Sequence, residues 1–312
     1  MVKNTKLNLQ RKLFCYFTVI NICLTKPSKL SLQMMHKLVI FFGILFTFSF
    51  QSDAQYFYKD IWSNKQVIKE FALLKSNNLK KVKIKSFEDN GEPSDGFFCE
   101  KQINKNYTQS QMISKSNITG QSLLVSDYNT SGYPVKTTDD TPNTNSITEY
   151  KYDSKGNITE ITTVAKGDDD SDKITETHEF SYDEKGVPLK MIRKKNGVLV
   201  STIHFVSDAN GNVIEEDVEG NNQVDKKYYY YYDDKNRLTD IVHYNERAAR
   251  LLPNYIYEYN SSNQPTQMIS TSEGSSNYFI WRYSYNDKNL RETEKCFSKE
   301  KRLLGSIQYE YN

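Results

Sequence analysis

The sequence has little cysteine, proline and tryptophan, and it lacks an apolar run long enough to cross a membrane as a helix. Its 312 residues include four Cys, seven Pro and two Trp. The uncharged apolar run Leu38–Phe50 has 13 residues, whereas a bilayer-spanning helix takes about 20. So few cysteines exclude a small fold held together by a disulfide framework. Charged residues at 26% and hydrophobic residues at 37% favour a folded chain over disorder.

The short apolar run is typical of an export signal. It follows Met34 or Met35, and Ser52 and Ala54 place small residues at the two positions that a signal peptidase reads. We therefore predict a signal peptide at 34–54, cleaved after Ala54, and a secreted or periplasmic protein. No Cys stands directly after the run, so a lipoprotein anchor is not expected. No membrane span is expected in the mature chain.

Residues 1–33 precede this signal and contain a second short apolar run. They are either a start codon assigned too early or an extended presequence. Residues 1–54 hold seven basic residues and one acidic residue, so their removal changes the net charge from +2 to −4. A protein that binds phosphate backbones carries a basic excess. Nucleic acid is therefore not expected as a partner.

Only Cys99 and Cys296 remain in the mature chain. An oxidising compartment permits one bridge between them. The sequence gives no distance between the two side chains, so the bridged and the free states both stay open.

Aromatic residues are abundant instead, with 23 Tyr and 16 Phe, and they recur in a repeat. The unit is aromatic-x-aromatic-Asp-x-x-Gly-Asn-aliphatic, and it is complete from Tyr150 to Ile158. The residues that open the turn of each unit fall at 88, 129, 153, 183, 208, 233, 260, 286 and 312. The first spacing is 41 residues and the others are 24 to 30. Such a period predicts one supersecondary unit per repeat.

The residue types at fixed positions of the unit predict a tight turn. An Asp or Asn that opens a turn bonds its side chain to a backbone N–H two residues on. Three residues later the backbone enters the left-handed region, which Gly and Asn tolerate best. The same pairing recurs upstream with Gly91 and Gly132. We predict structural turns at Asp153, Gly156, Asp183, Gly186, Asp208, Gly211, Asp233, Asn236, Asn260, Asn263, Asn286 and Asn289.

The residues flanking each turn alternate as half-buried strands do. The sequence therefore predicts an all-β fold, a long antiparallel meander of about eight β-hairpin repeats with about seventeen strands. Open sheets rarely exceed about 10 strands. We expect this sheet to curl into a spiral or a closed shell, with the tyrosine face inward. The repeat domain is expected to cover 80–312.

One short helix is predicted before the repeats, in a cap segment at 55–79. Ser63–Gln66 has the form of a capping box, and Val67, Phe71 and Leu74 share one helical face. We expect this helix to plug one end or edge of the sheet, because an uncovered edge strand invites aggregation.

The repeat resembles the YD repeat of RHS-type bacterial proteins. The resemblance covers roughly 80–312 and is most specific from Tyr150 onward. It implies an extracellular or envelope β-rich protein. Large members are shells around a carboxyl-terminal toxin, and some members are described as carbohydrate-binding. No toxin domain or self-cleavage segment follows the repeats in this sequence, so toxin delivery is not expected.

No motif predicts catalysis, a cofactor or a metal site, so we expect a protein that is not an enzyme. His178 lies on the aromatic face, without a motif that would make it catalytic. Asp168, Asp170, Asp172 and Glu179 have the spacing of a calcium loop, but Lys173 replaces its required glycine. A solvated hairpin tip is the better interpretation.

The tyrosine face allows two interpretations. Cross-strand aromatic pairs stabilise a sheet, and their recurrence in every unit favours this structural role. Tyrosine rings also suit sugar rings. The residues considered for sugar binding are Tyr230, Tyr257, Tyr283 and Trp281. The expected function is therefore a non-enzymatic binding or scaffold surface at the cell envelope, and the alternative is a carbohydrate-binding module with exposed tyrosines. The expected partner is a polysaccharide or another envelope protein.

Overall fold

The computed structural model describes residues 56–167, 173–220, 226–245, 249–271 and 277–312. The predicted presequence (1–33), the signal peptide (34–54) and its cleavage point lie outside these residues. So do Asp168, Asp170 and Asp172 of the calcium-loop spacing.

The described residues form one helix, α3 (Tyr58–Ser76), and one sheet of 18 strands. The strands are β1 (Lys81–Glu88), β2 (Phe98–Ile103), β3 (Gln109–Ser116), β4 (Gly120–Tyr128), β5 (Pro134–Thr141), β6 (Thr144–Tyr152), β7 (Ile158–Lys166), β8 (Ile174–Tyr182), β9 (Pro188–Lys195), β10 (Val198–Ser207), β11 (Val213–Gly220), β12 (Lys226–Tyr232), β13 (Leu238–Asn245), β14 (Arg250–Tyr259), β15 (Pro265–Thr271), β16 (Tyr278–Tyr285), β17 (Arg291–Ser298) and β18 (Leu303–Tyr311).

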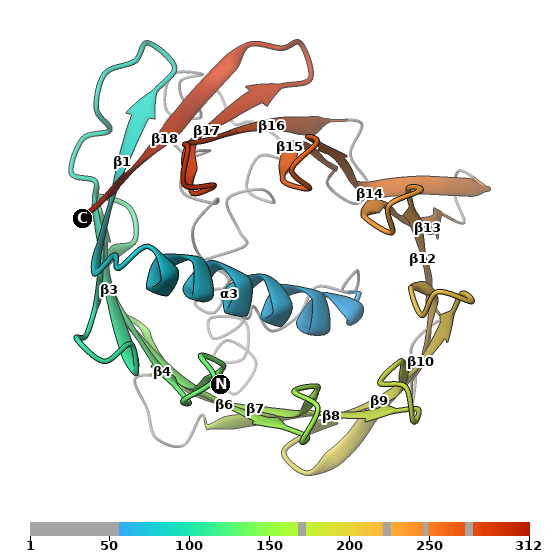
Figure 1. Ribbon diagram of the computed structural model, residues 1–312. Helices are drawn as coiled ribbons and strands as arrows, with labels where there is room; N and C mark the ends of the chain where they lie inside the picture. The colour runs from blue at the N-terminus through green and yellow to red at the C-terminus, as the bar shows by residue number, and fades with distance from the viewer. Residues whose placement is uncertain (1–55, 168–172, 221–225, 246–248, 272–276) are drawn as a thin grey trace, which may run out of the picture.

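The sheet is a closed barrel in which every strand is antiparallel to the strands before and after it (Figure 1). The first and last strands close the ring, with Val82 of β1 opposite Tyr311 of β18. The Asn312 carbonyl accepts hydrogen bonds from the backbone N–H groups of Lys80 and Lys81, each at 2.8 Å. The all-β hairpin meander is confirmed, and of the two expected shapes the structure has the closed one. Closure leaves no edge strand open.

The predicted turns are confirmed at the level of the backbone. The positions expected to have positive φ have it, from 82° to 85° at Gly156, Gly186 and Gly211. The asparagines at this position lie between 56° and 60°. In the turn that Asp153 opens, Oδ1 accepts the backbone N–H of Lys155 at 2.8 Å. The expected bulge is the register shift between Lys151 and Tyr152, just before this turn.

Two features of the repeat differ from the sequence pattern. The turn at Glu88–Gly91 joins β1 to β2 at the rim opposite the other predicted turns, because odd-numbered strands run toward that rim. The first repeat turn is instead opened by Asn104, whose Oδ1 accepts the N–H of Thr108 at 2.9 Å. Tyr107 takes the left-handed position with φ 56°. The left-handed position of this copy holds neither a glycine nor an asparagine, so the sequence pattern missed the copy and its first spacing came out as 41 residues.

In six units, the second tyrosine joins the repeat to the one before it. Its hydroxyl donates to the backbone carbonyl of the first residue of the preceding repeat's return strand, at 2.6–2.8 Å. The donors are Tyr152, Tyr182, Tyr232, Tyr259, Tyr285 and Tyr311. Ser207 takes this place in one unit, and its hydroxyl is buried without a partner among the described residues. This bond explains why the unit uses Tyr rather than Phe.

Replacing Tyr182 with Phe tests the bond. The variant Tyr182→Phe keeps the ring but leaves the Ile158 carbonyl without its donor, so we expect the free energy of unfolding to fall by about 1 kcal/mol. Urea denaturation measures this change. Tyr231→Phe is the control, because Tyr231 is 48% exposed on the outer face and its hydroxyl makes no such bond in the described structure. Equal losses in the two variants would contradict the assignment.

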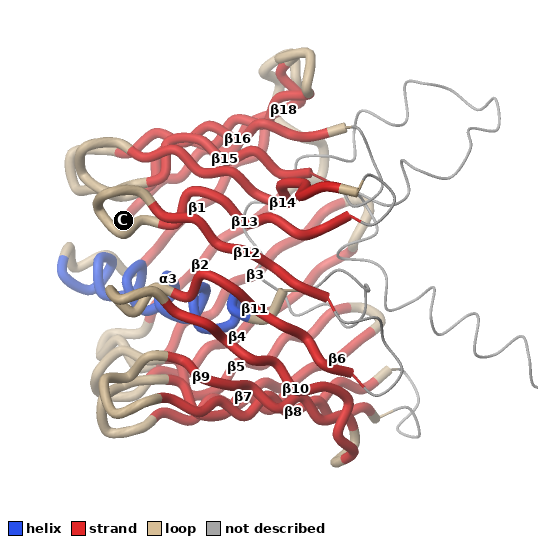
Figure 2. Tube along the Cα trace, turned by 90° about the vertical axis from the view of Figure 1, so that its right-hand side faces the viewer, coloured by secondary structure: helices blue, strands red, loops and turns tan. Residues whose placement is uncertain are grey.

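Helix α3 lies inside the barrel, with the sheet curving around it (Figures 1 and 2). Of the two expected positions for the plug, the helix takes the one toward an end of the barrel, within the lumen next to the rim that carries the repeat turns, and it covers no strand edge. The helix begins at Tyr58, five residues before the expected capping residue Ser63, whose hydroxyl is buried and without a partner in the described chain. Phe71 and Leu74 are buried as expected, but Val67 is 37% exposed. The helix ends as expected, at Ser76 before Asn77.

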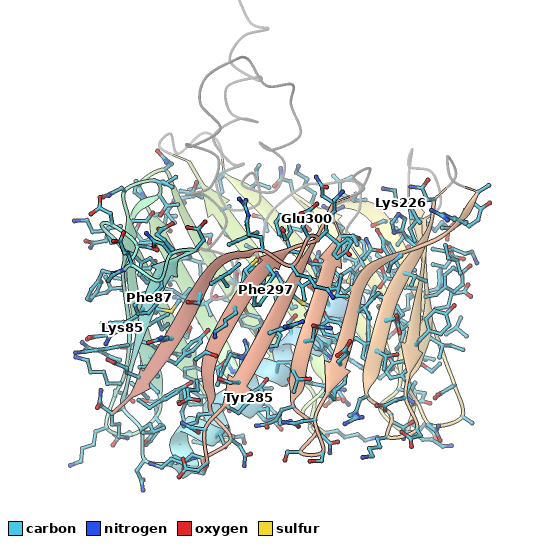
Figure 3. All side chains as sticks on the ribbon, turned by 90° about the horizontal axis from the view of Figure 1, so that it is seen from above. Lys85, Phe87, Lys226, Tyr285, Phe297 and Glu300 are labelled. Atoms are coloured by element: carbon cyan, nitrogen blue, oxygen red, sulfur yellow. The ribbon has the colours of Figure 1, made fainter. Side chains whose placement is uncertain are left out.

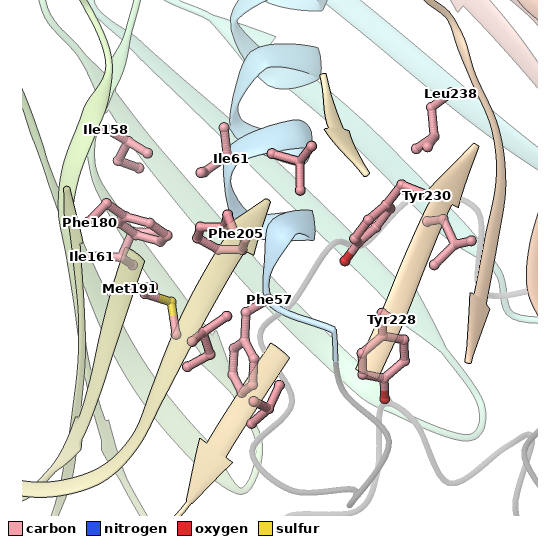
Figure 4. Close-up of a cluster of buried hydrophobic side chains, with 14 of the residues drawn as sticks. Phe57, Ile61, Ile158, Ile161, Phe180, Met191, Phe205, Tyr228, Tyr230 and Leu238 are labelled. Atoms are coloured by element: carbon pink, nitrogen blue, oxygen red, sulfur yellow. The ribbon is translucent and has the colours of Figure 1, made fainter. Parts of the chain in front are cut away.

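Apolar side chains from the barrel wall converge on both halves of the helix. The amino-terminal half contacts Phe180, Phe205 and Tyr230 among others (Figure 4). In the carboxyl-terminal half, Phe71 stacks on Tyr128 with ring centroids 3.6 Å apart. The tyrosine face therefore points inward as predicted, and its partner there includes the helix as well as neighbouring strands.

Candidate functional site

The amino terminus of α3 is held by a carboxylate from the barrel wall. The Glu216 side chain of β11 accepts the backbone N–H of Phe57 at 2.8 Å and that of Tyr58 at 2.7 Å. The Tyr230 hydroxyl of β12 donates to the same carboxylate at 2.7 Å. The first backbone N–H groups of a helix have no partner within the helix, and its dipole favours a negative charge there. Glu216 therefore does what the local sequence was expected to do through Ser63.

Glu216 is fully buried, and its surroundings set its charge. Burial raises the pKa of Glu216 to about 7, although the hydrogen bonds from Phe57, Tyr230 and Tyr58 oppose this shift. The Glu216 carboxyl group therefore titrates near neutral pH. Both its charged and its neutral form can accept the two backbone N–H groups.

A second polar cluster lies beside this cap and joins the helix to β8 and β9. The imidazole of His178 contacts Asp60 through Nδ1 at 2.6 Å and Glu176 through Nε2 at 2.9 Å. Arg193 donates to both oxygens of Glu176, at 2.9 and 3.1 Å. The Phe57 ring meets the imidazole edge-on at 5.7 Å between centroids. The cluster is an unbroken chain of charge-assisted contacts from the helix to two strands.

These contacts keep His178 charged. Burial alone would lower the pKa of His178, but the Asp60 and Glu176 carboxylates raise it to about 9. Burial alone would raise the pKa of Glu176, but the hydrogen bonds from His178 and Arg193 lower it to about 2. Because each carboxylate has a cationic partner, the cluster avoids the free-energy cost of an unpaired buried charge.

The polar groups of both clusters are bonded to one another, to Arg193 or to the helix. Both imidazole nitrogens of His178 are engaged by carboxylates, so neither is open toward a reacting group. Within the described ranges there is no group of three His, Cys, Asp or Glu side chains that could hold a metal ion. Glu179, from the calcium-loop spacing, instead pairs with Lys194 at 2.6 Å on the outer face.

The residues considered for sugar binding point into the barrel. Tyr230, Tyr257 and Trp281 are 2%, 8% and 7% exposed. Tyr230 serves the helix cap, and the Tyr257 ring lies 5.9 Å from that of Trp62 on the helix. Tyr283 is half-buried, with Arg291 over its ring. The structure therefore places these side chains in the packing of the interior, with no open aromatic face among the three buried ones.

Glu216 and Glu176 were not singled out from the sequence. Their signal was present, because both are acidic residues at inward-facing positions, with Phe180 inward on the strand of Glu176 and Val213 and Val218 inward on the strand of Glu216. No sequence pattern pointed to Asp60, because it lies before Ser63, where the helix was predicted to begin.

Cys99 and Cys296 are free thiols, and both are buried. They lie on β2 and β17, which are separated by β1 and β18. Three steps between neighbouring strands amount to about 14 Å, whereas bridged Cα atoms are rarely more than about 7 Å apart. The open question of a disulfide is settled in favour of two free thiols.

We expect a thiol reagent to modify neither cysteine in the folded protein and both in denaturant. Burial raises the pKa of each thiol to about 12, so little reactive thiolate forms at neutral pH. Intact-mass measurement after reaction counts the modified thiols. One or two adducts formed without denaturant at the rate of a free thiol would contradict the placement.

Searches for related proteins return distant structural similarity only. No family model matches the chain, and no curated protein matches it. Among the described residues, no helix is long and apolar enough to cross a membrane. The chain is similar to a porin-like protein from Bacteroides uniformis, with 10% identity and a TM-score of 0.37 over 75% of this chain and 98% of that one.

Two further solved structures show weaker similarity. A porin-like protein from Bacteroides vulgatus has 12% identity and a TM-score of 0.25, covering 75% of this chain and 98% of that one. The structure described as TcdB2-TccC3-TEV has 12% identity and a TM-score of 0.30, and the match covers 67% of this chain but 14% of that one.

Proposed function

We propose that the chain is an exported, non-enzymatic YD-repeat protein whose closed shell is a binding or scaffold surface at the cell envelope. The observation that carries this proposal is the use of the interior polar groups. Glu216, His178, Glu176 and Asp60 are buried and engaged with one another, with Arg193 or with the helix. Groups committed in this way hold a fold together, which leaves the outer wall and the rims as the surfaces for partners.

The outer wall supports the same proposal because much of it carries paired charges. Lys151 lies 2.9 Å from Glu160, and Lys227 lies 2.8 Å from Glu215, each pair joining neighbouring strands. Lys85, which Figure 3 labels, pairs with Glu310 across the strands that close the ring. A sheet surface that faces lipid carries an apolar band. Charged cross-strand pairs are instead typical of a wall in water, and we propose that this wall faces the aqueous phase.

Fractionation of cells that express the full chain tests the proposal. We expect the processed protein in the periplasmic or extracellular fraction, released by salt or osmotic shock without detergent. Recovery with envelope proteins or with polysaccharide in a pull-down would support a binding surface. A chain that remains unprocessed in the cytoplasm, or that needs detergent for release, would contradict the proposed location.

A carbohydrate-binding role remains the alternative, and the structure changes which residues it would use. Tyr230, Tyr257 and Trp281 are buried, whereas Tyr231 and Tyr244 are 48% and 52% exposed. Retention on insoluble polysaccharides, compared between the native chain and Tyr244→Ala, tests this role. Loss of retention in Tyr244→Ala would favour it, and absence of retention across the main polysaccharide classes would count against it.

A further inference from the structure

Glu216 is a buried carboxylate that has no cationic partner among the described residues. The described part of the chain buries four carboxylates. Three of them pair with His178 or Arg291 at 2.6–2.9 Å, and these are Asp60, Glu176 and Glu294. Glu216 instead accepts hydrogen bonds from two backbone N–H groups and one tyrosine hydroxyl, which are all neutral. Because a buried charge is costly unless it is paired, this site favours one further, cationic partner.

The carboxylate of Glu216 has an acceptor position left for such a partner. Its Oε2 atom accepts the N–H of Tyr58 and the hydroxyl of Tyr230, each at 2.7 Å. The two oxygens share the N–H of Phe57, at 2.8 Å from Oε1 and 2.9 Å from Oε2. Oε1 receives no other donor within the described ranges. A carboxylate offers about four acceptor sites, so Oε1 can accept one more hydrogen bond.

The chain just before the helix is held beside this carboxylate. The ring of Tyr56 lies 6.0 Å from that of Tyr228, 6.2 Å from that of Tyr230 and 5.9 Å from that of Tyr255, measured between centroids. Tyr230 is also the hydroxyl donor to Glu216, and Figure 4 shows Tyr228 and Tyr230 near the amino end of α3. Residue 56 is therefore fixed inside the barrel, close to the carboxylate.

The predicted cleavage after Ala54 creates a cation within reach of this site. The new α-amino group belongs to Gln55, which lies just outside the described residues. Its nitrogen is separated from that of Phe57 by two residues, which span at most about 7 Å. The Phe57 nitrogen is itself 2.8 Å from Oε1 of Glu216. The α-amino nitrogen is therefore at most about 10 Å from that oxygen, and a turn in the chain brings the two into contact.

Lys59 is another cation near this carboxylate, and it does not take the position. Burial lowers the pKa of Lys59, and the opposing charges of Asp60, Glu216 and Glu176 do not make up for this shift. No ion pair joins Lys59 to Glu216 in the part of the chain that the structure describes. The place beside Oε1 is therefore left to the amino terminus.

We infer that removal of the signal peptide creates the missing partner, and that the α-ammonium group of Gln55 pairs with the Glu216 carboxylate and fastens the amino end of α3 inside the barrel. The inference rests on the proposed export and processing of the chain. Before cleavage the same nitrogen belongs to an uncharged peptide group, so the pair exists only in the processed protein. Processing thereby strengthens the folded barrel.

The pairing changes how Glu216 titrates. Burial raises the pKa of Glu216 to about 7 in the uncleaved chain, and an ammonium group beside it opposes that shift. The pH dependence of this group between pH 4.5 and 7 therefore belongs to the uncleaved chain and is reduced after cleavage.

Amine labelling of the chain that begins at Gln55 tests the pairing. Exact cleavage of a fusion protein supplies this chain independently of export, and peptide mass spectrometry follows the reaction of its α-amino group. At about pH 8, near the usual pKa of this group, we expect the reaction to be at least tenfold slower in the folded chain than in Glu216→Gln. Two glycines placed before Gln55 give the matched control, whose amine should react equally fast with and without Glu216→Gln. Equal rates in the chain that begins at Gln55 and its Glu216→Gln variant would overturn the pairing.

Cyclisation of Gln55 gives a second comparison at constant chain length. The α-amino nitrogen attacks the side-chain amide carbon, a C–N bond forms and ammonia leaves, so the resulting lactam carries no ammonium group. Glutaminyl cyclase can perform this step on the denatured chain before refolding. We expect the cyclised chain to unfold at a lower urea concentration than the uncyclised one, and the two forms of Glu216→Gln to unfold alike. A loss of the same size in Glu216→Gln would overturn the pairing.

The amino-terminal sequence of the exported protein separates this inference from the proposed function. A protein that begins at Gln55 supports the processing on which the pairing depends. A protein that is exported but begins elsewhere overturns the pairing and leaves the envelope role standing. A chain that stays unprocessed in the cytoplasm contradicts both.

Discussion

Replacing Glu216 with Ala is expected to lower the free energy of unfolding by about 3–5 kcal/mol. The change leaves the backbone N–H groups of Phe57 and Tyr58 and the hydroxyl of Tyr230 without their acceptor in a buried site. Each unsatisfied buried donor costs about 1–3 kcal/mol, and the helix also loses its counter-charge. Urea denaturation followed by tyrosine fluorescence measures the loss.

Glu216→Gln is the matched control for this prediction. Its side-chain carbonyl still accepts hydrogen bonds, and it resembles the neutral form that a pKa of about 7 makes accessible. We expect it to lose no more than about 1 kcal/mol. A loss below that value in Glu216→Ala would contradict the role of Glu216 as the helix cap.

The second large effect is expected at His178. His178→Ala removes the cation between Asp60 and Glu176, and removal of one member of a buried ionic network costs about 3–5 kcal/mol. The same denaturation experiment measures it. His204→Ala is the control, because the His204 side chain is 51% exposed and lies 3.7 Å from Glu219 on the outer face. A network without structural importance would give equal, small losses in both variants.

The two clusters also predict how stability depends on pH. The fold raises the pKa of His178 from 6.5 to about 9, so its contribution is full below pH 6.5 and is lost as the pH rises through 9. It raises the pKa of Glu216 from 4.5 to about 7, so the contribution of the neutral form is full below pH 4.5 and is lost as the pH rises through 7. Each of these two pKa shifts changes the free energy of unfolding by about 3 kcal/mol across its pH range.

Glu176 acts in the opposite direction. Its pKa falls from 4.5 to about 2, so its contribution is present above pH 4.5 and is lost as the pH falls through 2. The contributions of Glu176 and Glu216 together therefore make stability greatest near pH 4.5. Melting temperatures measured from pH 2 to pH 9 test the sign on each side of this maximum. Glu216→Gln should flatten the slope between pH 4.5 and 7, and His178→Ala the slope between 6.5 and 9. Unchanged slopes in these variants would show that Glu216 and His178 do not cause the pH dependence of stability.

The barrel wall could be predicted from the sequence because its signals are local. Asp153 and Gly156 specify their turn through their own side-chain bond and positive φ, and alternation fixes which face of each strand is buried. The Asn104 turn was missed because Tyr107 holds a conformation that glycine or asparagine normally marks. Closure rather than a spiral depends on the pairing of β1 with β18, and no local pattern encodes that pairing.

The interior could not be predicted for a related reason. The helix begins before its apparent capping box because its cap is Glu216, 159 residues from Phe57 in the chain. A contact of that separation leaves no trace in the spacing of residues near the helix. The tyrosine face was assigned inward, but the helix was expected over one end or edge of the sheet, and its cover of this face inside the barrel was not foreseen. The residues considered for sugar binding were therefore taken from the covered face, and the exposed Tyr231 and Tyr244 were passed over.

Hydrogen exchange on the exported chain tests the central claim, that α3 is a fixed part of the barrel interior. The account predicts that the backbone amides between Ile61 and Leu74 exchange as slowly as those in the centre of β12, since both are released only when the barrel opens. Exchange of the helix amides at rates close to those of an isolated peptide, while β12 stays protected, would contradict it.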